Sequence, residues 1–136
     1  MVDVVDVADA AAPRHLFVYG TLRPGEVRWK FLEPFVVDDG TDDVADGSLF
    51  DTGLGYPAAT FEAASGLAIR GRVYGLREDM LQRALAELDI VEGAVRGVYR
   101  RVPITTAAGV GAWAYQFGTD PGIALVPIPS GDWLSR

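Results

Sequence analysis

The sequence predicts an α+β fold built on a mostly antiparallel, curled sheet. Short apolar runs with alternating side chains recur along most of the chain, and this pattern is typical of strands. The period changes to that of an amphipathic helix in one long stretch, residues 77–88. The chain has 136 residues, of which 49% are hydrophobic, so a single domain with a buried core is expected.

Each element follows from its own local pattern. β-Branched and aromatic residues before Gly20 predict a buried strand that stops at this glycine. Four apolar residues then anchor a short helix, which begins in the stretch 25–31 and which Pro34 ends. A solvated loop is expected over 38–46, which carries five aspartates. Further strands are predicted at 47–52, 58–62, 67–76, 99–106 and 111–118, and the tail 127–133 is expected to be extended and irregular.

The clearest change of period lies in the middle of the chain. In 67–76, apolar residues alternate with polar ones, as in a strand with one buried face. In 77–88 the apolar residues instead share one stripe of a helix, and Gly93 lies beyond its end. The segment 1–13 is interpreted as a poorly ordered extension, and 14–136 as a single domain.

Composition excludes several kinds of site. The net charge of −7 argues against nonspecific binding to nucleic acid or to an anionic membrane. Without cysteine the chain has no disulfide, thiol nucleophile or thiolate metal site. The single histidine, His15, excludes a metal site built on several imidazoles and is interpreted as a strand-edge residue. No apolar run approaches membrane-spanning length and no secretory signal is visible, so a cytoplasmic protein is expected.

The turn after the first strand is a candidate anion site. A strand that enters a turn at Gly20 and Thr21 leaves several backbone N–H groups without ladder partners. Such groups, gathered in a concave loop, can hold a carboxylate or a phosphate. Gly20 lets a ligand approach the main chain, and Thr21 is placed to cap the helix that follows. The alternative interpretation is a plain junction between strand and turn with core aromatics.

Glu92 is the second candidate. It lies just past the amphipathic helix, between Val91 and Gly93, with no basic residue before Arg96. Loss of hydration there is expected to raise its pKa above the value of about 4.3 of a free Glu, as general acid–base work at neutral pH requires. The alternative is a solvated or capping Glu. A guanidinium locked onto this carboxyl, or a position far from the Gly20 turn, would remove the proposed base.

Six short segments, each weak alone, occur in an order and spacing that are informative together. The segments are Tyr19-Gly20-Thr21-Leu22, Gly55-Tyr56-Pro57, Val73-Tyr74-Gly75, Leu88-Asp89 with Glu92-Gly93, Tyr99-x-Arg101 and Ser130-Gly131-Asp132-Trp133. This set resembles the γ-glutamylcyclotransferase-like superfamily. Within it, the chain is most similar to the bacterial and plant branch labelled AIG2-like or γ-glutamylamine cyclotransferase-like, from about residue 15 to residue 133.

The resemblance implies a small, mostly antiparallel β-barrel with flanking helices, and no metal or organic cofactor. It also implies a small-molecule γ-glutamyl amide or γ-glutamyl amine as substrate, from which attack by the α-amino group releases 5-oxoproline and a free amine. In such enzymes main-chain N–H groups hold the glutamyl α-carboxylate, and the matching loop residues here are Tyr19, Gly20, Thr21 and Leu22. The Glu of the E-G pair is the catalytic acid/base, which corresponds to Glu92.

Other polar side chains have less defined roles. Tyr115 is expected to bind substrate in the pocket or to fill the core, and Asp89 to fix the helix end or a loop. Arg101 is interpreted as the partner of a surface carboxylate, and Trp133 as a side chain that folds over the pocket mouth. Two other functions stay open: a non-catalytic module that binds a small carboxylate, and a different acyl or amide reaction, such as removal of a γ-glutamyl protecting group from a biosynthetic intermediate. The sequence specifies neither the amine, nor the oxyanion donors, nor the oligomeric state.

Overall fold

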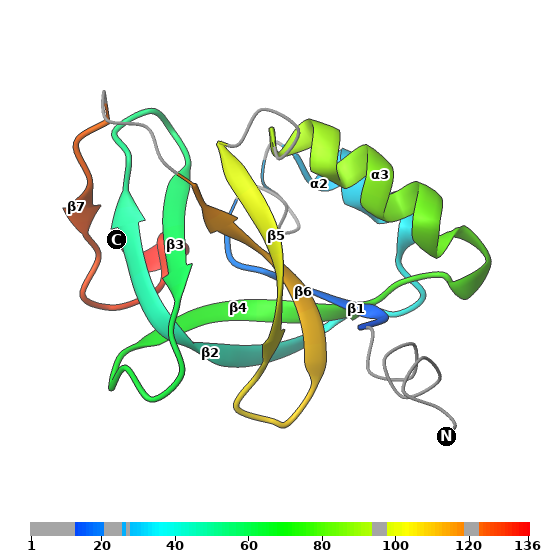
Figure 1. The fold of residues 1–136 in the computed structure, drawn as a ribbon, viewed down its shortest axis with the longest axis horizontal. Coiled ribbons are helices and arrows are strands. Elements are labelled where there is room, and N and C mark those ends of the chain that lie inside the picture. Colours follow the sequence, from blue (N-terminus) through cyan, green and yellow to red (C-terminus); the bar gives the residue numbers. More distant parts are fainter. Residues whose placement is uncertain (1–12, 21–25, 27, 94–97, 119–122) are drawn as a thin grey trace, which may run out of the picture.

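The computed structural model describes residues 13–20, 26, 28–93, 98–118 and 123–136. Within these ranges, seven strands form one strongly bent sheet (Figure 1). The strands are β1 (His15–Val18), β2 (Thr41–Asp51), β3 (Pro57–Phe61), β4 (Ala68–Gly75), β5 (Tyr99–Thr105), β6 (Gly111–Phe117) and β7 (Val126–Pro127).

In the described ranges, two α-helices and several short 3₁₀ turns accompany the sheet. The helices α2 and α3 lie side by side over one part of it, as Figure 1 shows. The helical elements are α2 (Trp29–Leu32), η1 (Glu33–Phe35), η2 (Glu78–Met80), α3 (Leu81–Val91) and η4 (Trp133–Ser135). In the part of the chain that the structure describes, no helix has the length and apolar character needed to cross a membrane.

The sheet curls into a nearly closed barrel. Its strand order is β3-β2-β4-β1-β6-β5, with β7 added beside β2. Neighbouring strands are antiparallel except for β1 and β6, which run parallel. Where β3 approaches β6, the side-chain oxygen of Gln116 accepts a hydrogen bond of 2.9 Å from the backbone N–H of Phe61. The predicted small, mostly antiparallel β-barrel with flanking helices is confirmed.

The Asp-rich segment 38–46 is the main difference from the sequence-based prediction of a loop. Strand β2 already begins at Thr41, and its first half pairs with β4 while its second half pairs with β3. Asp42 lies opposite Arg72 in this pairing, and their side chains form an ion pair of 2.7 Å. The prediction of a loop was wrong for 41–46 because cross-strand partners outweigh the low strand propensity of aspartate.

Helix α3 keeps its predicted apolar face, but neither helix keeps its predicted ends. Helix α3 extends to Val91, beyond the predicted end at Leu88, and its first turn is 3₁₀. Helix α2 ends at Leu32, and Pro34 lies in the 3₁₀ turn η1 that follows. Pro34 therefore does not end α2. Phe31, expected as an apolar anchor, is 43% exposed. The tail is also more regular than predicted, since it adds β7 to the edge of β2 and then forms η4.

The apolar run of β1 is explained by burial on both faces. Leu16 and Val18 pack into one hydrophobic cluster, which includes side chains from α2 and α3. Phe17 and Tyr19 pack into a second cluster on the other side of the sheet, which includes Trp133. A strand covered on both faces reads as a continuous apolar segment rather than an alternating one. Strand β1 is therefore the central wall between the two clusters.

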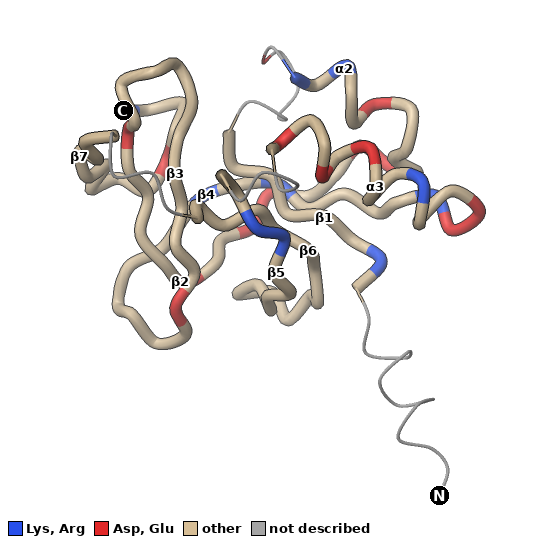
Figure 2. Tube along the Cα trace, turned by 45° about the horizontal axis from the view of Figure 1, so that its top comes forward, with Lys and Arg blue, Asp and Glu red and all other residues tan. Residues whose placement is uncertain are grey.

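Charged residues are distributed over several elements rather than gathered on one (Figure 2). Several ion pairs among the described residues are exposed, such as Arg14 with Glu78 at 2.8 Å and Arg83 with Glu87 at 3.1 Å. Exposed pairs of this kind contribute little to stability, because water and salt screen them. Partly buried pairs are better placed to affect chemistry, and one of them lies at the end of β1.

Candidate active site

A narrow pocket lies where β1 ends. Its cavity volume is about 20 Å³, which leaves room for about one water molecule. We call it the inner pocket. It brings together the Gly20 turn and Glu92, which are far apart in the sequence, as the proposed site requires. Thr21 and Leu22 lie outside the described residues. The lining residues are Phe17, Val18, Tyr19, Gly20, Arg28, Tyr56, Pro57, Glu92, Tyr99 and Tyr115.

The turn at the end of β1 packs directly against Pro57. A Cβ atom on Gly20 would lie 2.6 Å from Cγ and 2.9 Å from Cδ of Pro57, closer than two carbon atoms can approach. Glycine is needed here for close approach to a neighbouring ring as well as to a ligand. The Tyr19 side chain is 6% exposed and donates its hydroxyl hydrogen to the backbone oxygen of Tyr115. These contacts fix the described start of the predicted carboxylate loop.

The end of α3 positions Glu92. The Glu92 N–H donates to the Leu88 carbonyl at 2.9 Å, so this residue closes the last turn of the helix. Gly93 follows with φ of 73°, a left-handed conformation that glycine adopts without strain and that commonly ends helices. Glu92 and Gly93 therefore end helix α3 and place the Glu92 carboxylate at the pocket. This explains why the Glu-Gly pair directly follows the helix.

Arg28 contradicts the expectation that Glu92 has no basic neighbour. Its Nη1 lies 2.7 Å from Oε2 of Glu92, and the two side chains are 34% and 13% exposed. The prediction was wrong because Arg28 belongs to the turn before α2, 64 positions away along the chain. The pocket thus contains a partly buried ion pair rather than an isolated carboxylate.

Burial nevertheless raises the pKa of Glu92 above its ordinary range, because the buried carboxylate loses hydration. The positive charge of Arg28 and its hydrogen bond act in the opposite direction and lower this pKa. The net upward direction agrees with the sequence-based expectation. The pocket therefore holds a carboxyl group whose proton affinity is increased by burial and limited by one cation.

Three tyrosines enclose the carboxyl group. Burial raises the pKa of Tyr19, Tyr99 and Tyr115, so all three are neutral at physiological pH. Tyr99 donates its hydroxyl hydrogen to the Pro57 carbonyl, and Tyr115 donates to Oδ1 of Asp89 at 2.7 Å. Tyr115 is 2% exposed and also lines the inner pocket, so both of its expected placements, core and pocket wall, are found together.

Asp89 holds Tyr115 and Arg101 together. Its two carboxylate oxygens accept hydrogen bonds from Arg101 at 2.9 and 3.3 Å, besides the bond from Tyr115. The Arg101 guanidinium also lies over the Trp113 ring, 4.3 Å from its centroid. The Asp89 and Arg101 side chains are 24% and 23% exposed, so the expected surface pair is partly buried. This arrangement is consistent with a fixing role for Asp89.

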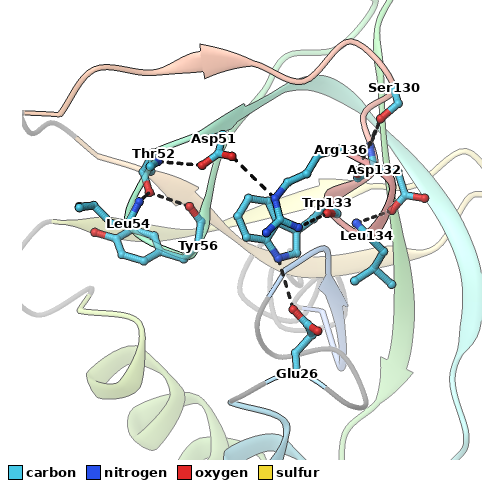
Figure 3. A network of polar contacts seen from close by, with 11 residues as sticks. Glu26, Asp51, Thr52, Leu54, Tyr56, Ser130, Asp132, Trp133, Leu134 and Arg136 are labelled. Atoms are coloured by element: carbon cyan, nitrogen blue, oxygen red, sulfur yellow. Dashed lines mark hydrogen bonds and ion pairs between the residues drawn. The ribbon is translucent and has the colours of Figure 1, made fainter.

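Trp133 does not cover the pocket mouth as expected. It is 2% exposed, packs in the second hydrophobic cluster and is absent from the lining of the inner pocket. Figure 3 shows its indole N–H directed at Oε1 of Glu26, at 3.3 Å. The Arg136 guanidinium lies over the same ring, 3.4 Å from its centroid. The C-terminal turn therefore contacts Glu26, two positions before Arg28.

A wider cleft adjoins the inner pocket. We call it the outer cleft; its volume is about 530 Å³. Its lining comprises Arg28, Tyr56, Ile90, Val91, Glu92, Gly93, Val98 and Tyr99. Four of these residues, Arg28, Tyr56, Glu92 and Tyr99, also line the inner pocket. Tyr56 is held by a tight turn in which the Thr52 hydroxyl donates to its carbonyl at 2.7 Å (Figure 3). The Arg28–Glu92 pair thus stands between the two spaces.

Sequence reasoning missed six lining residues of the inner pocket, namely Phe17, Val18, Arg28, Tyr56, Pro57 and Tyr99. Phe17 and Val18 were predicted only as part of the first strand. Tyr56, Pro57 and Tyr99 lie in segments that carried the family resemblance, which was the only available signal for them. Arg28 lies outside those segments. In the described part of the chain, no group of three or more His, Asp or Glu side chains is arranged to hold a metal ion.

Comparison with known proteins places these features in context. The family model described as "Gamma-glutamyl cyclotransferase, AIG2-like" matches residues 16–135. A "Putative gamma-glutamylcyclotransferase" of Vibrio cholerae is 36% identical over 124 residues, which are 90% of this chain and 98% of the relative. The gamma-L-glutamyl-butirosin B gamma-glutamyl cyclotransferase of Niallia circulans is 32% identical over 111 residues, which are 78% of this chain and 68% of the relative.

A solved structure shows a similar fold. The crystal structure of an AIG2-like protein from Mus musculus superposes with a TM-score of 0.53 at 20% sequence identity, over 80% of each chain. At this level of identity the likeness concerns the arrangement of the strands and helices. It agrees with the nearly closed barrel described above.

Proposed function

The chain belongs to the gamma-glutamyl cyclotransferase, AIG2-like family, and from this premise we propose that it converts a γ-glutamyl amide or γ-glutamyl amine into 5-oxoproline and a free amine. Glu92 is the proposed general acid/base. The observation that carries the proposal is that the Glu92 carboxyl and the Gly20 turn line the same inner pocket. Burial of this carboxyl, which raises its pKa, supports the same role.

The proposed reaction needs one proton carrier. The α-amino group of the glutamyl unit is mostly protonated at neutral pH, and the Glu92 carboxylate removes its proton. The freed amine attacks the γ-carbonyl carbon, so a new C–N bond closes a five-membered ring and the carbonyl becomes an oxyanion. The ring nitrogen now carries a positive charge and one surplus proton. Glu92 gives its proton to the departing nitrogen and the original amide C–N bond breaks. The Glu92 carboxylate then takes the surplus proton from the ring nitrogen and passes it to the released amine, which leaves as an ammonium ion. Atoms and charge balance without any other reactant.

The Gly20 turn supplies the proposed carboxylate cradle. Main-chain N–H groups that hold the α-carboxylate of the substrate confine a flexible side chain so that its two ends meet, and such proximity can lower a barrier by several kcal/mol. Tyr19 contributes through its main chain, because its side chain is buried in the core. Thr21 and Leu22 stay assigned to this loop by resemblance alone. Tyr115 also lines the inner pocket and limits the space available.

The Arg28 guanidinium on the Glu92 carboxyl is the kind of contact that was expected to remove the base, so the proposed function requires this contact to open when substrate binds. A base must be ionised before its substrate arrives, and a carboxylate in a poorly hydrated pocket stays ionised only if a cation is near. Arg28 is one-third exposed and lines both the inner pocket and the outer cleft. Because the inner pocket holds about one water molecule, movement of this side chain toward solvent is the proposed route by which substrate enters from the outer cleft.

Replacing Arg28 by Met is expected to move the acidic limb of the pH–activity profile to higher pH. Arg28 lowers the pKa of Glu92, so its removal raises that pKa, and the fraction of ionised Glu92 falls at any pH below the new value. The measurement is kcat/KM for a γ-glutamyl amide between pH 4 and 9, which reports ionisations of the free enzyme. A shift of about one pH unit, or about tenfold in kcat/KM at the acidic end, is expected.

Two variants complete this test. Arg28→Lys keeps the positive charge and is expected to return the acidic limb most of the way to its original pH. Arg83→Met removes an exposed arginine that pairs with Glu87 on α3, and is expected to leave the profile unchanged. An Arg28→Met profile that overlays that of the parent protein would show that the Arg28–Glu92 contact does not influence the ionisation that controls activity.

The proposed function is tested by incubating the protein with a panel of γ-glutamyl compounds and measuring 5-oxoproline. The panel contains γ-glutamyl amines, γ-glutamyl dipeptides, glutathione, and γ-L-glutamyl-butirosin B because one relative is named for it. Release of 5-oxoproline with an equal amount of free amine from at least one compound is expected. Tight binding of glutamate-like ligands with no release from any compound would instead support a binding module of the same fold.

A further inference from the structure

A series of hydrogen bonds joins helix α3 to the start of the Gly20 turn, and the proposed chemistry does not use it. The Tyr115 hydroxyl donates to Oδ1 of Asp89 at 2.7 Å. The backbone oxygen of Tyr115 accepts the hydroxyl hydrogen of Tyr19, the residue directly before Gly20. Tyr115 therefore contacts α3 through its side chain and the end of β1 through its main chain. We call these two bonds the Tyr115 link.

The two ends of the Tyr115 link lie beside the two parts of the proposed site. Asp89 precedes Glu92 by three positions at the end of α3, a spacing that places both side chains on the same face of a helix. Tyr19 starts the predicted carboxylate loop, and it lines the inner pocket together with Glu92. The link therefore connects the acid/base candidate to the turn, although these two parts are far apart in the sequence.

Arg101 holds the Asp89 carboxylate in one orientation. It donates to both carboxylate oxygens, at 2.9 and 3.3 Å, and a guanidinium fork on a carboxylate restricts the geometry of both groups. The guanidinium also lies 4.3 Å from the centroid of the Trp113 ring, which adds a cation–π contact. A carboxylate accepts hydrogen bonds and donates none, so the Tyr115 hydroxyl is the donor. The Asp89–Arg101 pair therefore fixes the acceptor to which Tyr115 binds.

We propose that Asp89 is a positioning residue for the cyclisation, because its bond to Tyr115 keeps the Glu92 carboxyl at the distance from the Gly20 turn that ring closure needs. This inference rests on the proposed function. Tyr115 is 2% exposed, so its ring cannot turn to solvent for another acceptor. Without the link the end of α3 shifts relative to the turn, and a displacement on the order of 1 Å at a reacting group costs about 10²-fold in rate.

The experiment measures kcat and KM for 5-oxoproline release by two variants of Asp89. Asp89→Ala removes the acceptor and is expected to lower kcat about 10²-fold, with KM changed less than about threefold because the turn still binds the α-carboxylate. Asp89→Asn keeps Oδ1, which accepts from both Tyr115 and Nε of Arg101. It loses only the longer bond, so its kcat is expected to stay within about fivefold of the parent value. Equally slow Asn and Ala variants would show that the charge of Asp89 matters rather than its position, and would overturn the inference.

Tyr115→Phe tests the same bond from its other side. It removes the hydroxyl and leaves the aromatic ring, the Asp89–Arg101 pair and the backbone oxygen that binds Tyr19. Its kcat is expected to fall at least about tenfold, again with little change in KM. The double variant of Tyr115→Phe with Asp89→Ala is expected to be no slower than Asp89→Ala alone, because both substitutions break one bond. Losses that multiply would show that the two residues act separately, and the link would be refuted.

Controls separate positioning from folding, and failure of this inference from failure of the proposed function. All kinetics are measured well below the lowest thermal midpoint of the set. Asp42→Ala breaks another Asp–Arg pair, with Arg72 at 2.7 Å, outside the inner pocket and the outer cleft, and is expected to keep the parent kcat. If Asp89→Ala and Tyr115→Phe lower the midpoint but keep the parent kcat, the link is only structural and the inference fails, while the cyclotransferase reaction stands. If the parent protein releases no 5-oxoproline, the proposed function fails and the inference fails with it.

Discussion

Replacing Glu92 by Gln is expected to lower kcat/KM for γ-glutamyl amides by about 10³-fold, which is within the range for loss of a general acid/base. Gln has nearly the same shape as Glu, but its amide cannot take a proton from the α-ammonium group. The substrate amine then stays protonated and does not attack. The measurement is 5-oxoproline release at saturating and limiting substrate, together with the thermal midpoint of unfolding to show that the variant is folded.

Glu87→Gln provides the matched control. Glu87 lies on the same helix, α3, and pairs with Arg83 at 3.1 Å on the exposed surface, so its substitution removes one negative charge from the helix without touching the pocket. Its kcat/KM is expected to equal that of the parent protein. If Glu92→Gln retained the parent activity as well, Glu92 would have no part in proton transfer and the proposed mechanism would fail.

The parts of the site that could be predicted from the sequence depend on local rules. The end of β1 is visible because apolar β-formers stop at a glycine, and the position of Glu92 follows from the end of an amphipathic helix next to Gly93. Both patterns need only a few consecutive residues. The fold class is predictable for the same reason, since alternation and helical period are read within single elements.

Arg28 and β2 could not be predicted, because tertiary partners decide them. Arg28 meets Glu92 across 64 positions of the chain, and a lone arginine before a short helix carries no sign of its partner. Asp42 and Asp43 read as a loop, yet they lie in a strand because β4 supplies cross-strand partners. The sequence therefore predicts the place of the Glu92 carboxylate but not its surroundings, because a cation from a distant segment, Arg28, binds it.

Replacing Gly20 by Ala is expected to lower kcat/KM by about 10²-fold. The added Cβ would lie 2.6 Å from Cγ of Pro57, and the proline ring has little freedom to move away. The turn must therefore shift by an amount on the order of 1 Å, and a displacement of this size in a group that positions substrate costs about 10²-fold. A higher KM is the expected main effect, because the turn binds the α-carboxylate in the proposed complex.

Pro57→Ala separates this steric cause from a general loss of folding. It removes the Cγ and Cδ atoms that the new methyl group would meet, while the carbonyl that accepts the Tyr99 hydrogen bond is kept. The double variant Gly20→Ala with Pro57→Ala is therefore expected to regain at least about tenfold in kcat/KM over Gly20→Ala, which is the coupling that contacting residues show. Gly111→Ala, where a Cβ meets open space, is expected to be silent. A double variant no better than Gly20→Ala would mean that the turn does not depend on its contact with Pro57, and the carboxylate cradle would then need another support.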